Sequence, residues 1–132
     1  MKTYEEVLSI LRCKTGYVYL ASPYSHADPD VREVRFKAVC KAAAILMADG
    51  VSVFSPIAHT HPIAIEGDLQ KGWDFWKRYD TEMIRACRCV CVLELPGWEA
   101  SAGICCEINL ARTLRKPVHH LPLSAFVVHR KE

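Results

Sequence analysis

Short apolar segments of strand length alternate with segments of helical periodicity along most of this chain. The strand-like segments are residues 17–21, 51–54, 90–93 and 116–120, and the helical ones are residues 3–12, 28–49, 74–87 and 101–115. Strands that are apolar throughout are typical of a sheet that is covered on both faces. The alternation therefore predicts an α/β fold of three layers, αβα, around a parallel sheet.

Two segments do not fit this alternation. Residues 55–72 are rich in proline and glycine, and we predict a long loop there. Residues 125–128 fit a strand or a helix equally well. The amphipathic segment 3–12 and the apolar residues 126–128 could each form an oligomer interface or pack on their own domain, and both alternatives stay open at this point.

Composition and charge exclude several functional classes. A chain of 132 residues suits one domain, residues 1–132. A net charge of +2 without a basic cluster argues against a nucleic acid polymer as partner, and no apolar run reaches the length of a membrane span. The acidic, polar start differs from a signal peptide, so we expect a cytoplasmic protein without membrane contact. The seven cysteines form no CxxC pair and are expected to be reduced, mostly buried thiols.

The loops that follow the strands predict the place of a binding site. In a parallel sheet with right-handed crossovers these loops share one edge, and ligands bind there. Residues 22–25, 55–57 and 96–98 fall at that edge, and their hydroxyls and aromatic rings suit a polar small molecule. The candidate binding residues in these loops are Ser22, Pro23, Ser25, Ser55, Gly97 and Trp98.

Glu107 is the first candidate for chemistry. It follows the apolar segment 89–93 and the turn Pro96-Gly97, about one and a half turns into a predicted helix. Ile104 and Ile108 mark the apolar stripe of that helix, so Glu107 lies on or beside the stripe and is expected to be partly desolvated. Two interpretations stay open: a buried ion pair, and a catalytic acid near a helix N-terminus.

Asp80 is a second acid on the apolar side of its helix, four residues after Trp76 and three before Met83. The alternative is a capping or salt-bridge role with Lys77 or Arg78. Two carboxyls that converge over a sheet edge suit glycosidic chemistry, in which one attacks or stabilises the anomeric carbon and the other handles protons. Burial raises the pKa of both acids, whereas the first turns of a helix favour an ionised Glu107.

Ser101 stands where the helix that carries Glu107 begins. As an N-cap, its hydroxyl would accept a hydrogen bond from the backbone. The same helix start, with Gly103 allowing close approach, is also a place where an anion can bind. The two roles can coexist, because backbone donors remain free for the anion.

Several of these segments together resemble known families. Residues 20–28 (LASPYSHAD), 95–98 (LPGW) and 101–103 (SAG) resemble a domain of unknown function, DUF1937. The pattern Ser101-x-Gly103-x-x-x-Glu107 after an apolar strand, with Asp80 on the preceding helix, is similar to the nucleoside 2-deoxyribosyltransferase superfamily. The resemblance covers residues 17–118, which is most of the chain.

The resemblance implies a fold, an activity and roles for particular residues. It implies a flavodoxin-like sheet of about five strands in the order 2-1-3-4-5. It implies cleavage or transfer at the N-glycosidic bond of a nucleoside or a nucleoside 5′-monophosphate, with Glu107 as the nucleophile that forms a covalent glycosyl-enzyme. Asp80 would orient the sugar or help to protonate the leaving base, and Tyr24 would line the sugar site.

Further implications concern the phosphate and the partners. Ser101 matches the position where nucleotide-cleaving relatives hold the 5′-phosphate, and relatives that act on nucleosides tend to have an acid there. The first loop lacks the arginine of nucleotide-hydrolysing relatives; Arg32 or Arg35 could replace it or face solvent. The resemblance also implies a homo-oligomer, a dimer or higher, and we expect no cofactor.

Other features leave alternatives open. His59 and His61 could bind a metal, recognise a base or belong to a plain loop, and because no third ligand has a fitting spacing we predict no metal site. Trp98 is favoured over Trp76 for stacking on a base, because Trp76 is expected in the core. Two other functions stay open: a nucleotide-binding module without turnover, and an enzyme that acts on an ADP-ribose-type nucleotide.

Overall fold

A computed structural model of the chain describes residues 2–12, 15–69, 73–124 and 126. Within these residues the chain forms one four-stranded sheet in the order β2-β1-β3-β4. The strands are β1 (Val18–Ala21), β2 (Val53–Phe54), β3 (Cys89–Glu94) and β4 (Val118–Pro122). All three neighbouring pairs are parallel. The predicted α/β class and parallel sheet are therefore confirmed.

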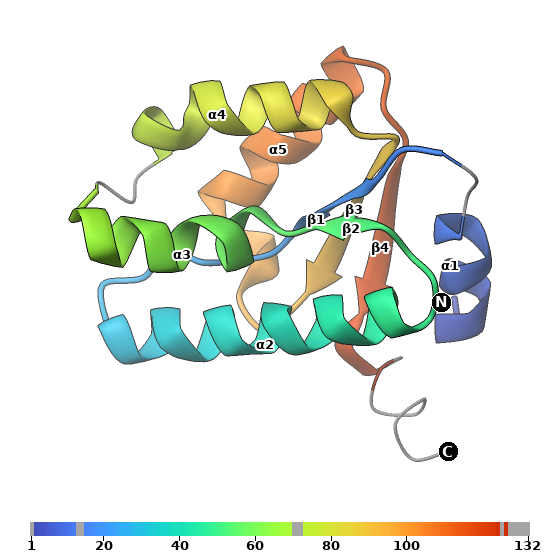
Figure 1. Ribbon diagram of the computed structural model, residues 1–132, viewed down its shortest axis with the longest axis horizontal. Helices are drawn as coiled ribbons and strands as arrows, with labels where there is room; N and C mark the ends of the chain where they lie inside the picture. Colours follow the sequence, from blue (N-terminus) through green and yellow to red (C-terminus); the bar gives the residue numbers. More distant parts are fainter. Residues whose placement is uncertain (1, 13–14, 70–72, 125, 127–132) are drawn as a thin grey trace.

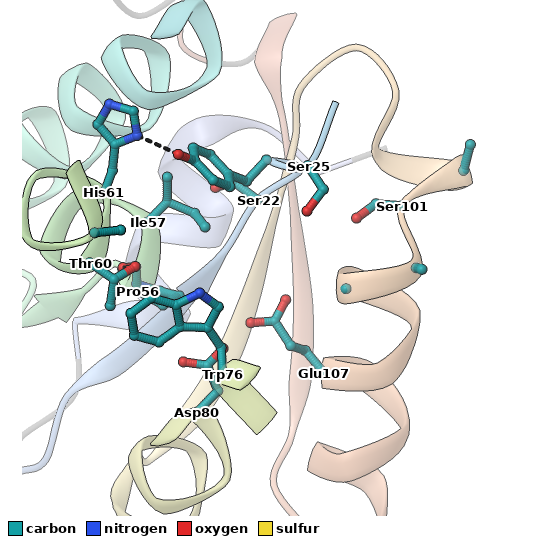
Figure 2. Close-up of a pocket in the computed structure, with 15 residues that line it drawn as sticks. Ser22, Ser25, Pro56, Ile57, Thr60, His61, Trp76, Asp80, Ser101 and Glu107 are labelled. Carbon is teal, nitrogen blue, oxygen red and sulfur yellow. Dashed lines mark hydrogen bonds between the residues drawn. The ribbon is translucent and has the colours of Figure 1, made fainter. Parts of the chain in front are cut away.

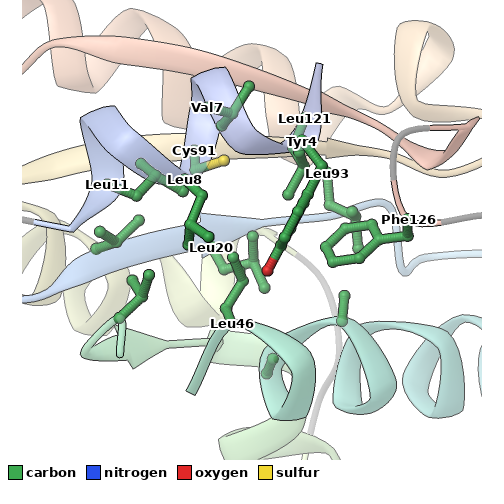
Figure 3. Packing of buried hydrophobic residues seen from close by; sticks show 14 of the residues in the cluster. Tyr4, Val7, Leu8, Leu11, Leu20, Leu46, Cys91, Leu93, Leu121 and Phe126 are labelled. Carbon is green, nitrogen blue, oxygen red and sulfur yellow. The ribbon is translucent and has the colours of Figure 1, made fainter. Parts of the chain in front are cut away.

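Helices cover both faces of the sheet (Figure 1). On one face lie α1 (Tyr4–Leu11) and α2 (Pro29–Ala48), and on the other lie α4 (Trp73–Ala86) and α5 (Ala102–Thr113). Two separate clusters of buried side chains match this division. The first, shown in Figure 3, joins α1 and α2 to side chains such as Leu20 and Leu93. The second joins α4 and α5 to Tyr19, Val90 and their neighbours, so the sheet is the middle of three layers.

The helices begin where the sequence provides caps. Asp28 accepts a hydrogen bond from the backbone N–H of Asp30, and Pro29 follows it in the first turn of α2. Ser101 accepts from the N–H of Ile104 at 3.2 Å and begins α5. A short 3-10 helix, η1 (Trp98–Ala100), links β3 to α5. These caps place both helix starts at the carboxyl edge of the sheet.

The predicted loop at residues 55–72 is wrong, because most of it forms the helix α3 (Pro56–Gly67). Ser55 caps this helix by accepting from the N–H of Ala58 at 3.1 Å, and Pro56 occupies its first turn, where a missing N–H has no cost. Pro62 lies inside the helix and removes one hydrogen-bond donor, which is why its presence indicated a loop. The pair Ser55-Pro56 was the signal for a helix start.

The expected fifth strand is not found among the described residues. After β4 the chain turns helical at Leu123 and Ser124, and Phe126 packs against Tyr4 of α1 with ring centroids 5.2 Å apart. Residues 127 and 128 lie outside the described part of the chain. The buried side of α1 belongs to the first core cluster, so this helix packs on its own sheet. The prediction of a homo-oligomer is not tested by this packing.

Two further properties follow from the described residues. None of their helices is both long enough and apolar enough to cross a membrane. The thiols of Cys87 and Cys91 are buried, those of Cys40 and Cys106 are half-buried, and that of Cys105 is exposed. None of these five cysteines forms a disulfide, and Cys13 lies outside the described residues.

Candidate active site

A cavity of about 350 Å³ opens at the carboxyl edge of the sheet, between the loop after β1, α3, α4 and the start of α5. Its wall combines hydroxyls, aromatic rings and two carboxyls, many of which Figure 2 labels. The lining residues are Ser22, Tyr24, Ser25, Pro56, Ile57, Thr60, His61, Ala64, Trp76, Asp80, Ala100, Ser101, Ala102, Gly103 and Glu107. The cavity is within the size range of small-molecule sites and lies at the edge where the strand order predicts one.

Glu107 lies on the buried side of α5 together with Ile104 and Ala111, and only 6% of it is exposed. The hydroxyl of Tyr19, on β1, donates a hydrogen bond to its Oε2 atom. Among the described residues, no salt bridge includes Glu107. The buried carboxyl is therefore held by a neutral donor, and the ion-pair interpretation is not supported.

The surroundings of Glu107 change its acidity. Burial raises its pKa to about 8, and the charge of Asp80 contributes in the same direction. The hydrogen bond from Tyr19 opposes this change because it stabilises the ionised form. Burial, with the charges of Glu107 and Asp80, also raises the pKa of Tyr19 well above its usual value, so Tyr19 keeps its proton and remains a donor.

Asp80 enters the same cavity from α4 (Figure 2). It is 7% exposed, and burial raises its pKa to about 7. Its Oδ1 atom is buried without a hydrogen-bond partner among the described residues, and no described salt bridge includes it. The salt-bridge interpretation with Lys77 or Arg78 is therefore not supported, and a buried unpaired oxygen next to a cavity suits a ligand hydroxyl or proton.

Hydroxyls and the start of α5 form the opposite side of the cavity. Ser101 is the N-cap of α5 and also lines the cavity, together with Gly103. The first N–H groups of a helix have no intrahelical acceptor, so those of Ala102 and Gly103 are free to bind an acceptor in the cavity. Ser22 is 5% exposed, and its Oγ has no partner among the described residues.

A chain of hydrogen bonds forms another part of the wall. The hydroxyl of Tyr24 lies 2.5 Å from Nδ1 of His61, which the dashed line in Figure 2 marks. The Nε2 atom of the same ring lies 3.2 Å from Oε1 of Glu33, on α2. Phe36 stacks on the ring, with centroids 4.2 Å apart at 25°. His61 was only one of two histidines in a predicted loop, and helix α3 is what aims it at Tyr24.

Four of the predicted binding residues do not line the cavity. Pro23 is buried beside it, and Ser55 caps α3. Gly97 forms the turn before η1 with φ of +93°, and a Cβ added there would lie 2.6 Å from Nη2 of Arg35. Trp98 packs in the second core cluster, edge-on to His120 with centroids 5.4 Å apart. These four residues therefore have structural roles next to the cavity and do not line it.

Trp76 lines the cavity and Trp98 does not, so the geometry favours Trp76 over Trp98 as the ring available for stacking. Trp76 and Asp80 are four residues apart and share one side of α4, which brings both to the same wall. Of the residues of α3 that line the cavity, Pro56 and Ile57 fall in a segment predicted at this edge, and His61 had base recognition as one open role. Thr60 and Ala64 were missed because the helix was not predicted.

The arginines of α2 hold the loop after β1. Arg35 donates to the carbonyl oxygen of Ser25 at 3.0 Å, and Arg32 donates to that of His26. Both are half-buried and reach back to backbone carbonyls at the protein surface. Neither lines the cavity, and no other described Lys or Arg does.

No metal centre is found within the described part of the chain, where no three His, Cys, Asp or Glu side chains are placed to hold an ion. His59 is exposed and lies over Tyr79, with ring centroids 6.1 Å apart at 19°. His59 and His61 therefore point to different surroundings and do not form a pair of ligands.

A family model described as Domain of unknown function (DUF1937) matches residues 16–122. The chain belongs to this family. The part that matches DUF1937 begins after α1 and contains every residue that lines the cavity. No curated protein matches the sequence.

Proposed function

We propose that this DUF1937 protein cleaves or transfers the N-glycosidic bond of a nucleoside or a nucleoside 5′-monophosphate. Glu107 is the nucleophile, and Asp80 protonates the leaving base and orients the sugar. The proposal joins the resemblance of the Ser101 to Glu107 segment to nucleoside 2-deoxyribosyltransferases with the chemistry of the cavity. One observation carries it: two carboxyls from different helices, both buried and without a cation, converge on one cavity of small-molecule size.

The first step would form a covalent glycosyl-enzyme. An oxygen of ionised Glu107 attacks C1′ of the sugar while the bond from C1′ to the base nitrogen breaks. The electron pair of that bond stays on the base, which takes the proton of Asp80. The hydrogen bond from Tyr19 favours the charge on Glu107, and the buried Oδ1 of Asp80 has no hydrogen bond to stabilise a charge, and both contacts favour this assignment. Burial works against it, because it raises the pKa of Glu107 to about 8 and that of Asp80 to about 7.

The second step would release the sugar. Water or a second base attacks C1′ and gives up one proton, the bond from C1′ to the Glu107 oxygen breaks, and Glu107 leaves as a carboxylate. Asp80, which became ionised in the first step, regains a proton before the next cycle. Water as the acceptor gives hydrolysis, and a base as the acceptor gives transfer. Trp76, at the cavity wall, offers a flat ring on which a nucleobase can stack.

A 5′-phosphate would bind at the start of α5. There the free backbone N–H groups of Ala102 and Gly103 and the proton of the Ser101 hydroxyl can donate to its oxygens. Because no described Lys or Arg lines the cavity, this phosphate would be held by neutral donors and the helix dipole alone. A nucleoside, whose 5′-hydroxyl carries no charge, fits the same donors.

A screen for released base tests the proposal. Purified protein is incubated with ribonucleosides, 2′-deoxynucleosides, their 5′-monophosphates and an ADP-ribose-type dinucleotide, and free base is measured by chromatography. We expect release from at least one nucleoside or monophosphate, and loss of release in Glu107→Ala with the circular dichroism spectrum unchanged. Glu99→Ala, which removes an exposed acid from η1, is the matched control.

Two results would overturn the proposal. Unchanged release in Glu107→Ala would exclude Glu107 as the nucleophile. Binding of nucleotides by wild type and Glu107→Gln with equal affinity, without release of base by either, would instead indicate a nucleotide-binding module without turnover. Release from the dinucleotide alone would move the substrate to the ADP-ribose class.

A further inference from the structure

Beyond the two carboxyls, the hydrogen-bonded chain of Tyr24, His61 and Glu33 is the polar feature of the cavity that the proposed mechanism does not use. It joins three elements: the loop after β1, α3 and α2. Tyr24 and His61 line the cavity, whereas the side chain of Glu33 is 44% exposed on the outside. The chain thus connects the cavity to the solvent side of the molecule through a ring that is itself only 6% exposed.

The partners of His61 determine where its proton lies. An ionised carboxylate only accepts hydrogen bonds, so Nε2 carries the proton that faces Glu33. In the neutral ring Nδ1 is then an acceptor, and the Tyr24 hydroxyl donates to it. The hydroxyl oxygen of Tyr24 then acts as an acceptor: the Arg32 guanidinium donates to it, and its other lone pair can accept a proton from the cavity that Tyr24 lines.

The ring of His61 is also fixed in orientation. Phe36 stacks on one face at 4.2 Å between centroids, and the ring of Tyr24 meets it edge-on at 5.4 Å and 80°. Burial, with the charge of Glu33, raises the pKa of Tyr24, and the Arg32 guanidinium opposes this change. Tyr24 therefore keeps its hydroxyl proton at neutral pH and can pass a proton on without becoming a stable anion.

We propose that Tyr24, His61 and Glu33 form a proton relay that activates the water that hydrolyses the glycosyl-enzyme. The oxygen of the water bonds to C1′ while the water gives a proton to the hydroxyl oxygen of Tyr24. At the same time the original hydroxyl proton of Tyr24 moves to Nδ1 of His61. The bond from C1′ to Glu107 breaks, and its electron pair returns to the carboxylate. Glu33 stabilises the resulting imidazolium, which gives its extra proton to solvent afterwards.

This inference rests on the proposed function and sharpens it, because it assigns water rather than a second base as the acceptor. Tyr24 is the member that meets the water, and His61 and Glu33 act through it. A relay that serves only the second step leaves the release of the first base unchanged. Its loss should therefore make the glycosyl-enzyme accumulate, which a purely structural role would not do.

Rapid-quench measurements with sodium azide test the relay. Natural ribonucleosides, 2′-deoxynucleosides and their 5′-monophosphates are each mixed with wild type, His61→Gln and His59→Gln. For a substrate that wild type cleaves, His61→Gln should release a burst of one equivalent of base per site and then turn over about 100-fold more slowly. Azide attacks C1′ without losing a proton, so it should restore turnover and yield a glycosyl azide. His59→Gln, two residues away and exposed, should behave as wild type.

Glu33→Gln is a second variant that is expected to fold normally, because Glu33 is partly exposed and belongs to neither core cluster. It should show a smaller slowing of the second step with the same rescue by azide. The relay is overturned if wild type releases base and His61→Gln slows the burst as much as the later turnover, keeps the wild-type rate, or is not rescued by azide. Wild type that releases no base from any of these substrates would instead overturn the proposed function itself, and the relay with it.

Discussion

The hydroxyl of Tyr19 donates a hydrogen bond to Oε2 of Glu107, across 88 residues of sequence. Tyr19 is fully buried on β1, and Glu107 is buried on α5, so the bond crosses from the sheet to the helix layer at the base of the cavity. Because this bond uses Oε2, the other carboxyl oxygen of Glu107, Oε1, remains available to a ligand in the cavity that Glu107 lines. The bond also opposes the effect of burial on the pKa of Glu107, which makes an ionised carboxylate attainable near neutral pH.

Base release should have a bell-shaped pH profile with its maximum between about pH 7 and 8. Burial raises the pKa of Asp80 to about 7 and that of Glu107 to about 8, so the pair holds one proton in this range. The higher pKa of Glu107 places that proton more often on Glu107 than on Asp80, so the reactive form, with Glu107 ionised and Asp80 protonated, is the minor one-proton form, and its population follows the same bell. At lower pH both carboxyls are protonated and no nucleophile exists, and at higher pH both are ionised and no acid remains. The measurement is kcat/KM for base release from pH 5 to 10. A flat profile across pH 6 to 9 would contradict the assignment of both roles.

Asp80→Asn should remove one limb of the pH profile of base release. Asparagine cannot give a proton, so the alkaline limb should disappear along with most of the activity. On the acid limb Asp80 is protonated in wild type and carries no charge, so the neutral asparagine should leave the position of that limb unchanged or move it slightly to higher pH. Tyr19→Phe should move the acid limb clearly to higher pH, because the lost hydrogen bond had lowered the pKa of Glu107.

The folded protein should gain stability at alkaline pH when Glu107 is replaced by Gln. The raised pKa of Glu107 means that the folded state holds its proton more tightly than the unfolded chain, whose pKa is near 4.5. The contribution of Glu107 to stability is therefore complete below pH 4.5 and is lost as the pH rises toward and through about 8. At pH 9 the variant should exceed wild type by on the order of 4 kcal/mol more than it does at pH 5. Urea unfolding at the two pH values measures this, and an equal difference at both would show that Glu107 is not buried as an acid.

Ser101→Asp should raise KM for a nucleoside 5′-monophosphate more than KM for the matching nucleoside. Aspartate is as good an N-cap as serine, so α5 and the thermal midpoint should be retained. Its charge would repel a 5′-phosphate at the start of α5, and KM for a 5′-monophosphate should rise at least tenfold while KM for the matching nucleoside changes little. Equal effects on both substrates would place the phosphate elsewhere. Ser124→Asp, outside the cavity, is the charge control.

Trp76→Ala should change substrate binding, whereas Trp98→Ala should change thermal stability. Trp76 lines the cavity, so its loss should raise KM for a cleaved nucleoside roughly tenfold or more through lost base stacking. Trp98 packs against the second core cluster and His120, so its loss should lower the thermal midpoint and leave KM nearly unchanged. Steady-state kinetics and thermal melts on both variants check this, and the reverse pattern would exclude Trp76 as the stacking residue.

The pattern of residues predicted the three layers and the burial of Glu107 and Asp80, because both depend on local periodicity. The alternation of apolar and helical segments gave the parallel sheet, and the stripe beside Glu107 predicted its burial. Helix α3 was missed because Pro62 outweighed the cap at Ser55. The position of Trp98 against the second core cluster depends on the turn of its loop, which local periodicity does not reveal.

Partners far apart in sequence could not be predicted by the same means. The bonds from Tyr19 to Glu107 and from Tyr24 to His61 depend on how β1, α3 and α5 meet in space. No spacing rule links residues 88 or 37 positions apart. The hydrogen-bonded chain through His61 therefore depends on α3 lying as a helix beside the loop after β1.

Mass spectrometry of the acid-quenched enzyme tests the central claim most directly. Wild type and His61→Gln are mixed with a nucleoside or monophosphate that the screen identifies, quenched, digested and analysed. The account predicts a peptide containing Glu107 that carries the added mass of one sugar or sugar phosphate, strongest in His61→Gln and missing in Glu107→Gln. Release of base without any sugar on Glu107, or with sugar on a different residue, would contradict it.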